Sequence, residues 1–151
     1  MSQNSTFDVE RSKFATATYC NDLLRAPLAG ILEAGWMTFA LVIAIRYFDA
    51  SETHKAFIAG AGPIGFLITP ITLYIAASFR ARPSLSCAFI FTAAALLLVG
   101  ASLAQSLLFF TLFVVLSQVV AVQQRPLMLQ IYPENYTRAE RGSRMTWPFI
   151  L

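Results

Sequence analysis

Two ionisable side chains, Glu33 and Arg125, lie inside stretches that are otherwise apolar. A charge costs at least a few kcal/mol at the centre of a bilayer, so such residues usually face a cavity or a partner. With a rise of 1.5 Å per residue, Glu33 lies about 6 Å and Arg125 about 9 Å from the middle of its stretch, on the same side. This similar depth permits an ion pair. Glu33 is the candidate proton carrier or substrate contact, and Arg125 its candidate partner or an anion contact.

Arg125 also belongs to a repeating pattern. Thr111, Gln118, Arg125 and Tyr132 recur every seven residues, which keeps them on nearly one face of a helix with a drift of about 20° per step. One interpretation is a polar stripe that lines a water-filled path. The alternative is that Arg125 extends to the cytoplasmic headgroups and the other residues are incidental. We expect the neighbouring Gln123 and Gln124 to be interfacial.

The rest of the chain offers little for catalysis or metal binding. His54 is the one histidine, and the two cysteines, Cys20 and Cys87, are too far apart in sequence and environment to indicate a disulfide framework. No His, Cys or acidic cluster and no nucleophile motif appears in the sequence. We therefore expect no enzyme activity, no metal and no cofactor.

A glycine-rich segment at residues 60–65 matches G-x-G-x-x-G literally. A dinucleotide site would need a preceding strand and an acidic residue about 20 positions later, but a charged link precedes the segment and the next acidic residue is Glu134. Small residues that let membrane helices approach closely explain it better. The residues expected to pack in this way are Gly60, Ala61, Gly62 and Gly65.

The elements that must position these residues are membrane-spanning helices. The chain is 57% hydrophobic and 13% charged, with a mean hydropathy of +0.62, whereas soluble domains carry about a quarter charged residues. Residues 83–124 contain no charge. As one helix they would extend about 63 Å, twice a bilayer core of about 30 Å, so two crossings and a tight turn are expected. The apolar runs are continuous and not alternating, which favours helices over a barrel.

The sequence thus predicts an all-α, polytopic membrane helix bundle. An aqueous tail is expected at residues 1–25. The predicted spans are residues 26–48, 56–79, 85–101 and 106–132, and a fifth starts at Trp147.

Positive charges alternate between the two sides of these spans. Eight Lys and Arg residues, in the tail, the link between the second and third spans and the link after the fourth, fall on one side. Arg46 and Lys55 fall on the other side. By the positive-inside rule, the amino terminus is expected to be cytoplasmic, in a cell (inner) membrane. The net charge of +3 reflects this rule, so no nucleic-acid partner is expected.

The segment Gln130-Ile131-Tyr132-Pro133-Glu134-Asn135-Tyr136, followed by Glu140-Arg141-Gly142, resembles the charged link between spans four and five of major facilitator superfamily transporters. The cytoplasmic amino terminus and the short basic turn between spans two and three are similar to that family as well. The resemblance implies two six-helix halves with substrate bound between them, of which residues 20–151 would form the first third of the protein. It implies that spans one and four line the cavity, and it makes Glu140, Arg141 and Gly142 a cytoplasmic loop motif.

Two functions remain open at this point. The first is secondary active transport of a small solute by alternating access, with a proton or sodium ion as coupling partner, in which this chain is an incomplete amino-terminal portion. The second is a small four-span accessory or structural subunit that packs through Ala61 and Gly65 in the bilayer.

Overall fold

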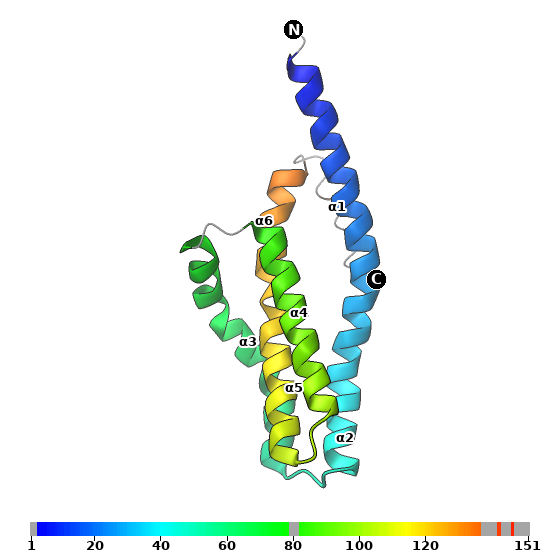
Figure 1. The fold of residues 1–151 in the computed structure, drawn as a ribbon, viewed down its shortest axis with the longest axis vertical. Helices are drawn as coiled ribbons and strands as arrows, with labels where there is room; N and C mark the ends of the chain where they lie inside the picture. The colour runs from blue at the N-terminus through cyan, green and yellow to red at the C-terminus, as the bar shows by residue number, and fades with distance from the viewer. Residues whose placement is uncertain (1–2, 79–81, 137–141, 143–145, 147–151) are drawn as a thin grey trace. The chain divides into compact units, whose positions relative to one another are not determined.

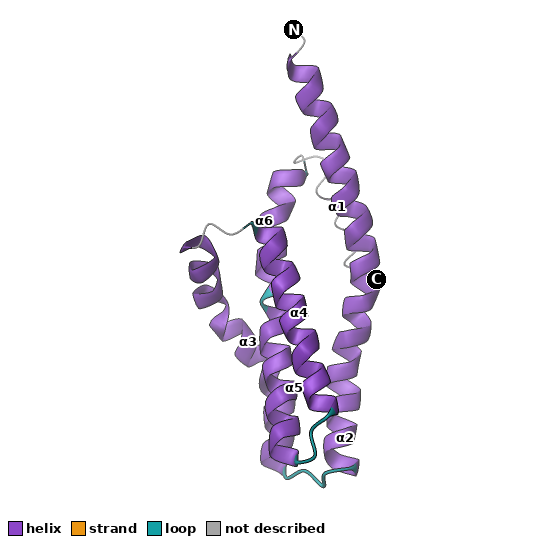
Figure 2. Ribbon diagram, viewed as in Figure 1, coloured by secondary structure: helices purple, strands orange, loops and turns teal. Residues whose placement is uncertain are grey.

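The protein is all-helical throughout its described part. The computed structural model describes residues 3–78, 82–136, 142 and 146, and no strand occurs among them (Figure 2). Four helical stretches are long and apolar enough to cross a membrane, namely Lys13–Arg46, Glu52–Ser78, Pro83–Ser102 and Leu107–Tyr132. These stretches support the expected class, a multi-pass helical membrane protein.

The chain divides into two compact units, and each is described by itself. The first unit comprises Met1–Glu33 and Gln130–Leu151, and the second comprises Ala34–Leu129. The first unit holds α1 (Gln3–Ala34) and the later part of α6 (Gln124–Asn135). The second unit holds the helices that carry most of the predicted site.

The α1 helix begins far earlier than the predicted first span, at Gln3. Residues 1–25, the expected aqueous tail, contain no glycine or proline to interrupt a helix. In the chain, α1 is followed directly by the π-helix η1 (Gly35–Ala40) and by α2 (Leu41–Arg46). The end of α2 is closed by the backbone N–H of Ala50, which donates to the carbonyl of Ala44 at 2.9 Å.

The second unit is built around α5 (Leu107–Val122). Both α3 (Glu52–Ser78) and α4 (Pro83–Ser102) pack on α5 (Figure 1). The loop that joins α4 to α5 is short, and the Ser106 hydroxyl caps α5 by accepting from the Phe109 N–H at 3.5 Å. Gly100 lets the Phe113 ring approach, since a Cβ at this glycine would lie 3.1 Å from ring carbons.

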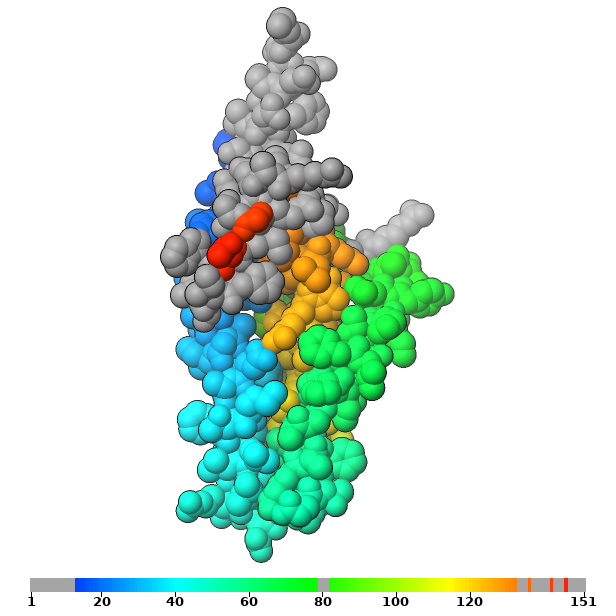
Figure 3. Space-filling view, turned by 180° about the vertical axis from the view of Figure 1, so that it is seen from behind, coloured from blue at the N-terminus to red at the C-terminus, as the bar shows by residue number. Residues whose placement is uncertain are grey.

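The core of the second unit lies where η1 and α2 pack against α3 and α5. Buried residues from all four elements meet there, including Ala44, Ile58 and Val114. The rings of Phe48 and Phe110 lie 5.1 Å apart and join the α2–α3 loop to α5. In the space-filling view, α2 and the first turns of α3 form a continuous surface (Figure 3). Apolar burial of this kind fixes α3 against α5 with a defined register.

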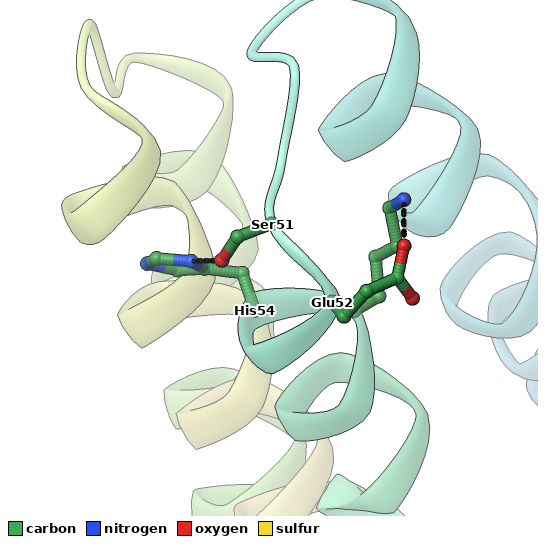
Figure 4. Close-up of polar contacts among 4 residues, drawn as sticks. Ser51, Glu52 and His54 are labelled. Atoms are coloured by element: carbon green, nitrogen blue, oxygen red, sulfur yellow. Dashed lines mark hydrogen bonds and ion pairs between the residues drawn. The ribbon is translucent and has the colours of Figure 1, made fainter.

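The first turn of α3 is closed by polar side chains (Figure 4). The Ser51 hydroxyl and His54 Nδ1 lie 2.9 Å apart, and Lys55 Nζ donates to Glu52 Oε1 at 2.9 Å. Glu52 also places a carboxylate in the first turn, where the helix dipole favours negative charge. His54 therefore has a local structural role in ending the α2–α3 loop.

The predicted fourth span, residues 106–132, is not one regular helix. It is divided at Gln123 into α5 and α6. Pro126 explains the division, because its nitrogen has no hydrogen to donate to the carbonyl of Val122 and its ring crowds that carbonyl. The Gln123 N–H instead donates to the carbonyl of Val120 at 3.1 Å, a tighter turn than the α-helix.

Candidate functional site

The contact between α3 and α5 is close enough to bring two backbones together. A Cβ placed on Gly65 would lie 3.2 Å from Val119 Cα and 3.3 Å from the Val119 carbonyl oxygen. Ala61, one turn earlier on the same face, is fully buried. Gly62 is buried too, whereas Gly60 is half-buried. Three of the four small residues predicted to pack therefore lie on the buried face of α3.

Two glutamines of the predicted fourth span form hydrogen bonds across the contact between α3 and α5. Gln118 Nε2 donates to the carbonyl of Ile58 at 3.4 Å, and Gln123 Nε2 donates to the carbonyl of Gly65 at 2.6 Å. Both acceptors lie on α3, and the order of the bonds along the two segments shows that α3 and α5 run parallel. Gln123 Nε2 also donates to the carbonyl of Val119 at 3.1 Å. Both of its amide hydrogens therefore have backbone acceptors.

Two hydroxyls lie on the same buried side of α5. Ser117 is fully buried, and its hydroxyl donates to the carbonyl of Val114 at 2.9 Å. Thr111 is 7% exposed, and its hydroxyl has no hydrogen-bond partner among the described residues. The polar face predicted from the seven-residue spacing thus consists, in α5, of Thr111 and Gln118, and it lies within the protein.

Glu33 and Arg125, the two charged residues predicted to lie within spans, belong to different units. Arg125 is exposed, and its guanidinium carbon lies 5.8 Å from the centroid of the Phe66 ring, a cation–π distance. Glu33 is an exposed residue of α1, two positions before the first residue of the π-helix η1. The ion pair between Glu33 and Arg125 stays a prediction.

The first unit contains a buried polar cluster that no sequence pattern had predicted. Asp22 of α1 is 3% exposed and receives a hydrogen bond from Arg25 Nε at 3.1 Å. The Tyr132 side chain is hydrogen-bonded to Asp22. The ring of Tyr132 stacks on that of Tyr136 with centroids 5.8 Å apart. A carboxylate, a guanidinium and a phenol therefore join α1 to the end of α6 inside this unit.

The sequence carried signals for both missed features. Asp22 lies seven residues after Ala15 and four before Ala26, and these two alanines are buried with it, so small residues marked the packed face of α1. Gln123 lies three residues before Pro126, and a proline inside a membrane helix disrupts the hydrogen bonds of the preceding turn. A neighbouring polar side chain is then able to bond to the backbone there.

Part of the predicted loop motif lies outside the described residues. Glu140 and Arg141 are outside them, as is the predicted start of the fifth span at Trp147. Gly142 is helical and exposed, and its carbonyl accepts from the Thr146 hydroxyl at 2.8 Å. Across the described residues, no group of three His, Cys, Asp or Glu side chains is placed to hold a metal ion.

The comparisons with known proteins give no match. No family model matches it, and neither a curated protein nor a solved structure is significantly similar to it.

Proposed function

We propose that the chain is part of a secondary active transporter that moves a small solute across a membrane by alternating access, as the resemblance to the major facilitator superfamily implies. In this proposal it forms the first spans of the amino-terminal six-helix half. The amino terminus lies in the cytoplasm, and the membrane is a cell (inner) membrane. Glu33 carries the coupling proton or contacts the solute, and Thr111, Gln118 and Arg125 belong to the solute path.

The observation that carries the proposal is the series of buried polar side chains on α5. Thr111, Ser117 and Gln118 lie within a helix that otherwise contains only Leu, Val, Phe and Ala. Polar groups within a span are expensive, and for that reason they often mark a substrate or ion path. Gln118 is occupied by a bond to Ile58, but the Thr111 hydroxyl has no partner in the described part of the chain. A solute that presents an acceptor or donor to Thr111 would satisfy it.

The test is uptake into proteoliposomes made with the product of the complete reading frame. A panel of radiolabelled sugars, amino acids and organic acids is offered with and without an imposed pH gradient. We expect uptake of one class, its loss in Glu33→Gln when a pH gradient drives it, and a higher KM in Thr111→Val. Thr92→Val is the matched control, because the exposed Thr92 hydroxyl bonds only to its own helix, to the carbonyl of Ala88 at 2.9 Å. Unchanged gradient-driven uptake by Glu33→Gln would remove its proposed role.

The alternative function, an accessory subunit, depends on the small residues of α3. It needs Ala61 and Gly65 to be available to another protein, yet both are buried within this chain and Gly65 lies against α5. The transporter is therefore the better supported proposal. A stop codon directly after Leu151 in the gene would favour the subunit, and several further apolar spans would favour the transporter.

A further inference from the structure

Gln123 presents a buried acceptor that no described residue satisfies. The residue is 5% exposed, and its Oε1 has no hydrogen-bond partner in the described part of the chain. The orientation of the amide is fixed by chemistry, because Nε2 lies 2.6 Å and 3.1 Å from two carbonyl oxygens. Turning the amide over would bring its oxygen against those acceptors. Oε1 therefore remains an acceptor that needs a donor.

Thr69 presents a second buried polar atom beside the same turn of α3. Its Oγ1 is buried and has no partner among the described residues. Thr69 lies one helical turn after Gly65, on the same face of α3, and the Gly65 carbonyl points along the helix towards it. Because Gln123 bonds to that carbonyl, the amide of Gln123 and the hydroxyl of Thr69 belong to one region of the α3–α5 contact.

Prolines add acceptors in this region. Pro70 has no N–H to donate to the carbonyl of Phe66, and Pro126 has none for that of Val122. Figure 1 shows that α3 bends away from α5 in its second half, as expected of a helix that contains Pro63 and Pro70. The carbonyls of Phe66 and Val122 therefore lack the N–H donors of a regular helix, and both are neutral acceptors.

We propose that Gln123 Oε1 and Thr69 Oγ1 form a binding site for a hydroxyl group. The O–H of the ligand donates to Gln123 Oε1, and its oxygen accepts from the Thr69 hydroxyl. The group belongs either to an ordered water or to a small polyhydroxylated solute, since both offer the same donor and acceptor. This site lies on the α3–α5 contact, and its existence does not depend on transport.

The sign of a thermal shift tests the site. Thr69→Val keeps the shape of the side chain and removes its hydroxyl. If that hydroxyl holds a ligand, the Tm of the purified full chain in nanodiscs should fall by about 2–4 °C. Thr92→Val is the matched control, because the exposed Thr92 hydroxyl bonds within its own helix, to the carbonyl of Ala88 at 2.9 Å; its Tm should change little. A Thr69→Val Tm equal to or above that of the wild type would overturn the proposal.

A double-mutant cycle tests whether the two residues share one ligand. The Tm shifts of Thr69→Val and Gln123→Met should fail to add in the double variant, since losing either residue already releases the ligand. Additive shifts would overturn the shared site.

The source of the hydroxyl group is then determined with a panel of hexoses and pentitols. A solute that raises the Tm of the wild type but not of Thr69→Val identifies itself as the ligand, and a panel without effect, alongside the expected fall in Tm, assigns the site to water.

Discussion

The side-chain amide of Gln123 donates to the backbone carbonyl of Gly65 at 2.6 Å, across 58 residues of sequence. The bond lies where α5 ends and α3 comes close enough for backbone contact. It therefore joins the end of α5 to the part of α3 that lies against the α5 backbone.

The two interhelical glutamine bonds should differ in strength. Gln123 makes two bonds of 2.6 Å and 3.1 Å, whereas Gln118 makes one of 3.4 Å, which is long for an N–H donor. Interhelical hydrogen bonds in membrane proteins contribute about 0.6 kcal/mol on average and about 1.7 kcal/mol at most. We expect Gln123→Met to lower the free energy of unfolding by about 1–1.7 kcal/mol and Gln118→Met by about 0.5 kcal/mol or less. Unfolding in SDS, followed by circular dichroism, measures both, and the reverse order would contradict the geometry.

The close approach at Gly65 should make that position intolerant of side chains. A Cβ there lies 3.2 Å from Val119 Cα, a backbone atom that moves only if the helices separate. We expect Gly65→Leu to lower the free energy of unfolding by about 1–3 kcal/mol.

Gly62 is the matched control, because a Cβ there meets no atom within 4 Å. Gly62→Ala should be neutral or raise stability by about 0.5–1 kcal/mol, as alanine does in a helix interior. Gly65→Ala should show less benefit than Gly62→Ala. Equal effects at the two glycines would show that a Cβ at Gly65 lies farther from Val119 Cα than 3.2 Å.

The sequence was enough to predict the helices but not their partners. Hydropathy located the spans, and the seven-residue spacing placed Thr111 and Gln118 on one helix face, which the structure shows to be buried. The identity of the facing helix depends on which apolar surfaces fit, and the sequence does not contain that information in any local pattern. The spacing therefore indicated a polar stripe, but it did not predict that Gln118 donates to the carbonyl of Ile58.

The missed residues show a second limit. Asp22 and Gln123 were assigned to a tail and to an interface because charge and polarity usually indicate contact with water. Their burial depends on specific partners, Tyr132 and Arg25 for Asp22 and the carbonyls of Gly65 and Val119 for Gln123. Only a packed structure reveals that such partners exist.

The hydrogen bond between Tyr132 and Asp22 should stabilise the first unit. Tyr132 is 4% exposed and Asp22 3%, and a bond to a charged group contributes about 1.5–3 kcal/mol. We expect Tyr132→Phe to lower the free energy of unfolding by about that amount. Tyr74→Phe is the control, since Tyr74 is 75% exposed and should change stability by less than about 0.5 kcal/mol. A Tyr132→Phe variant as stable as Tyr74→Phe would show that the bond contributes nothing.

The proposed orientation can be tested with the natural cysteines. Cys20 is exposed on α1, whereas Cys87 is buried in α4, so Cys87→Ala leaves one reactive thiol. If the amino terminus is cytoplasmic, a membrane-impermeant maleimide should label Cys20 in inside-out vesicles and not in right-side-out vesicles. Gln105→Cys, added to a variant without other cysteines, places an exposed thiol in the α4–α5 loop and should give the opposite result. Labelling of Cys20 from the outside would reverse the topology, and with it the assignment of the arginine-rich links to the cytoplasm.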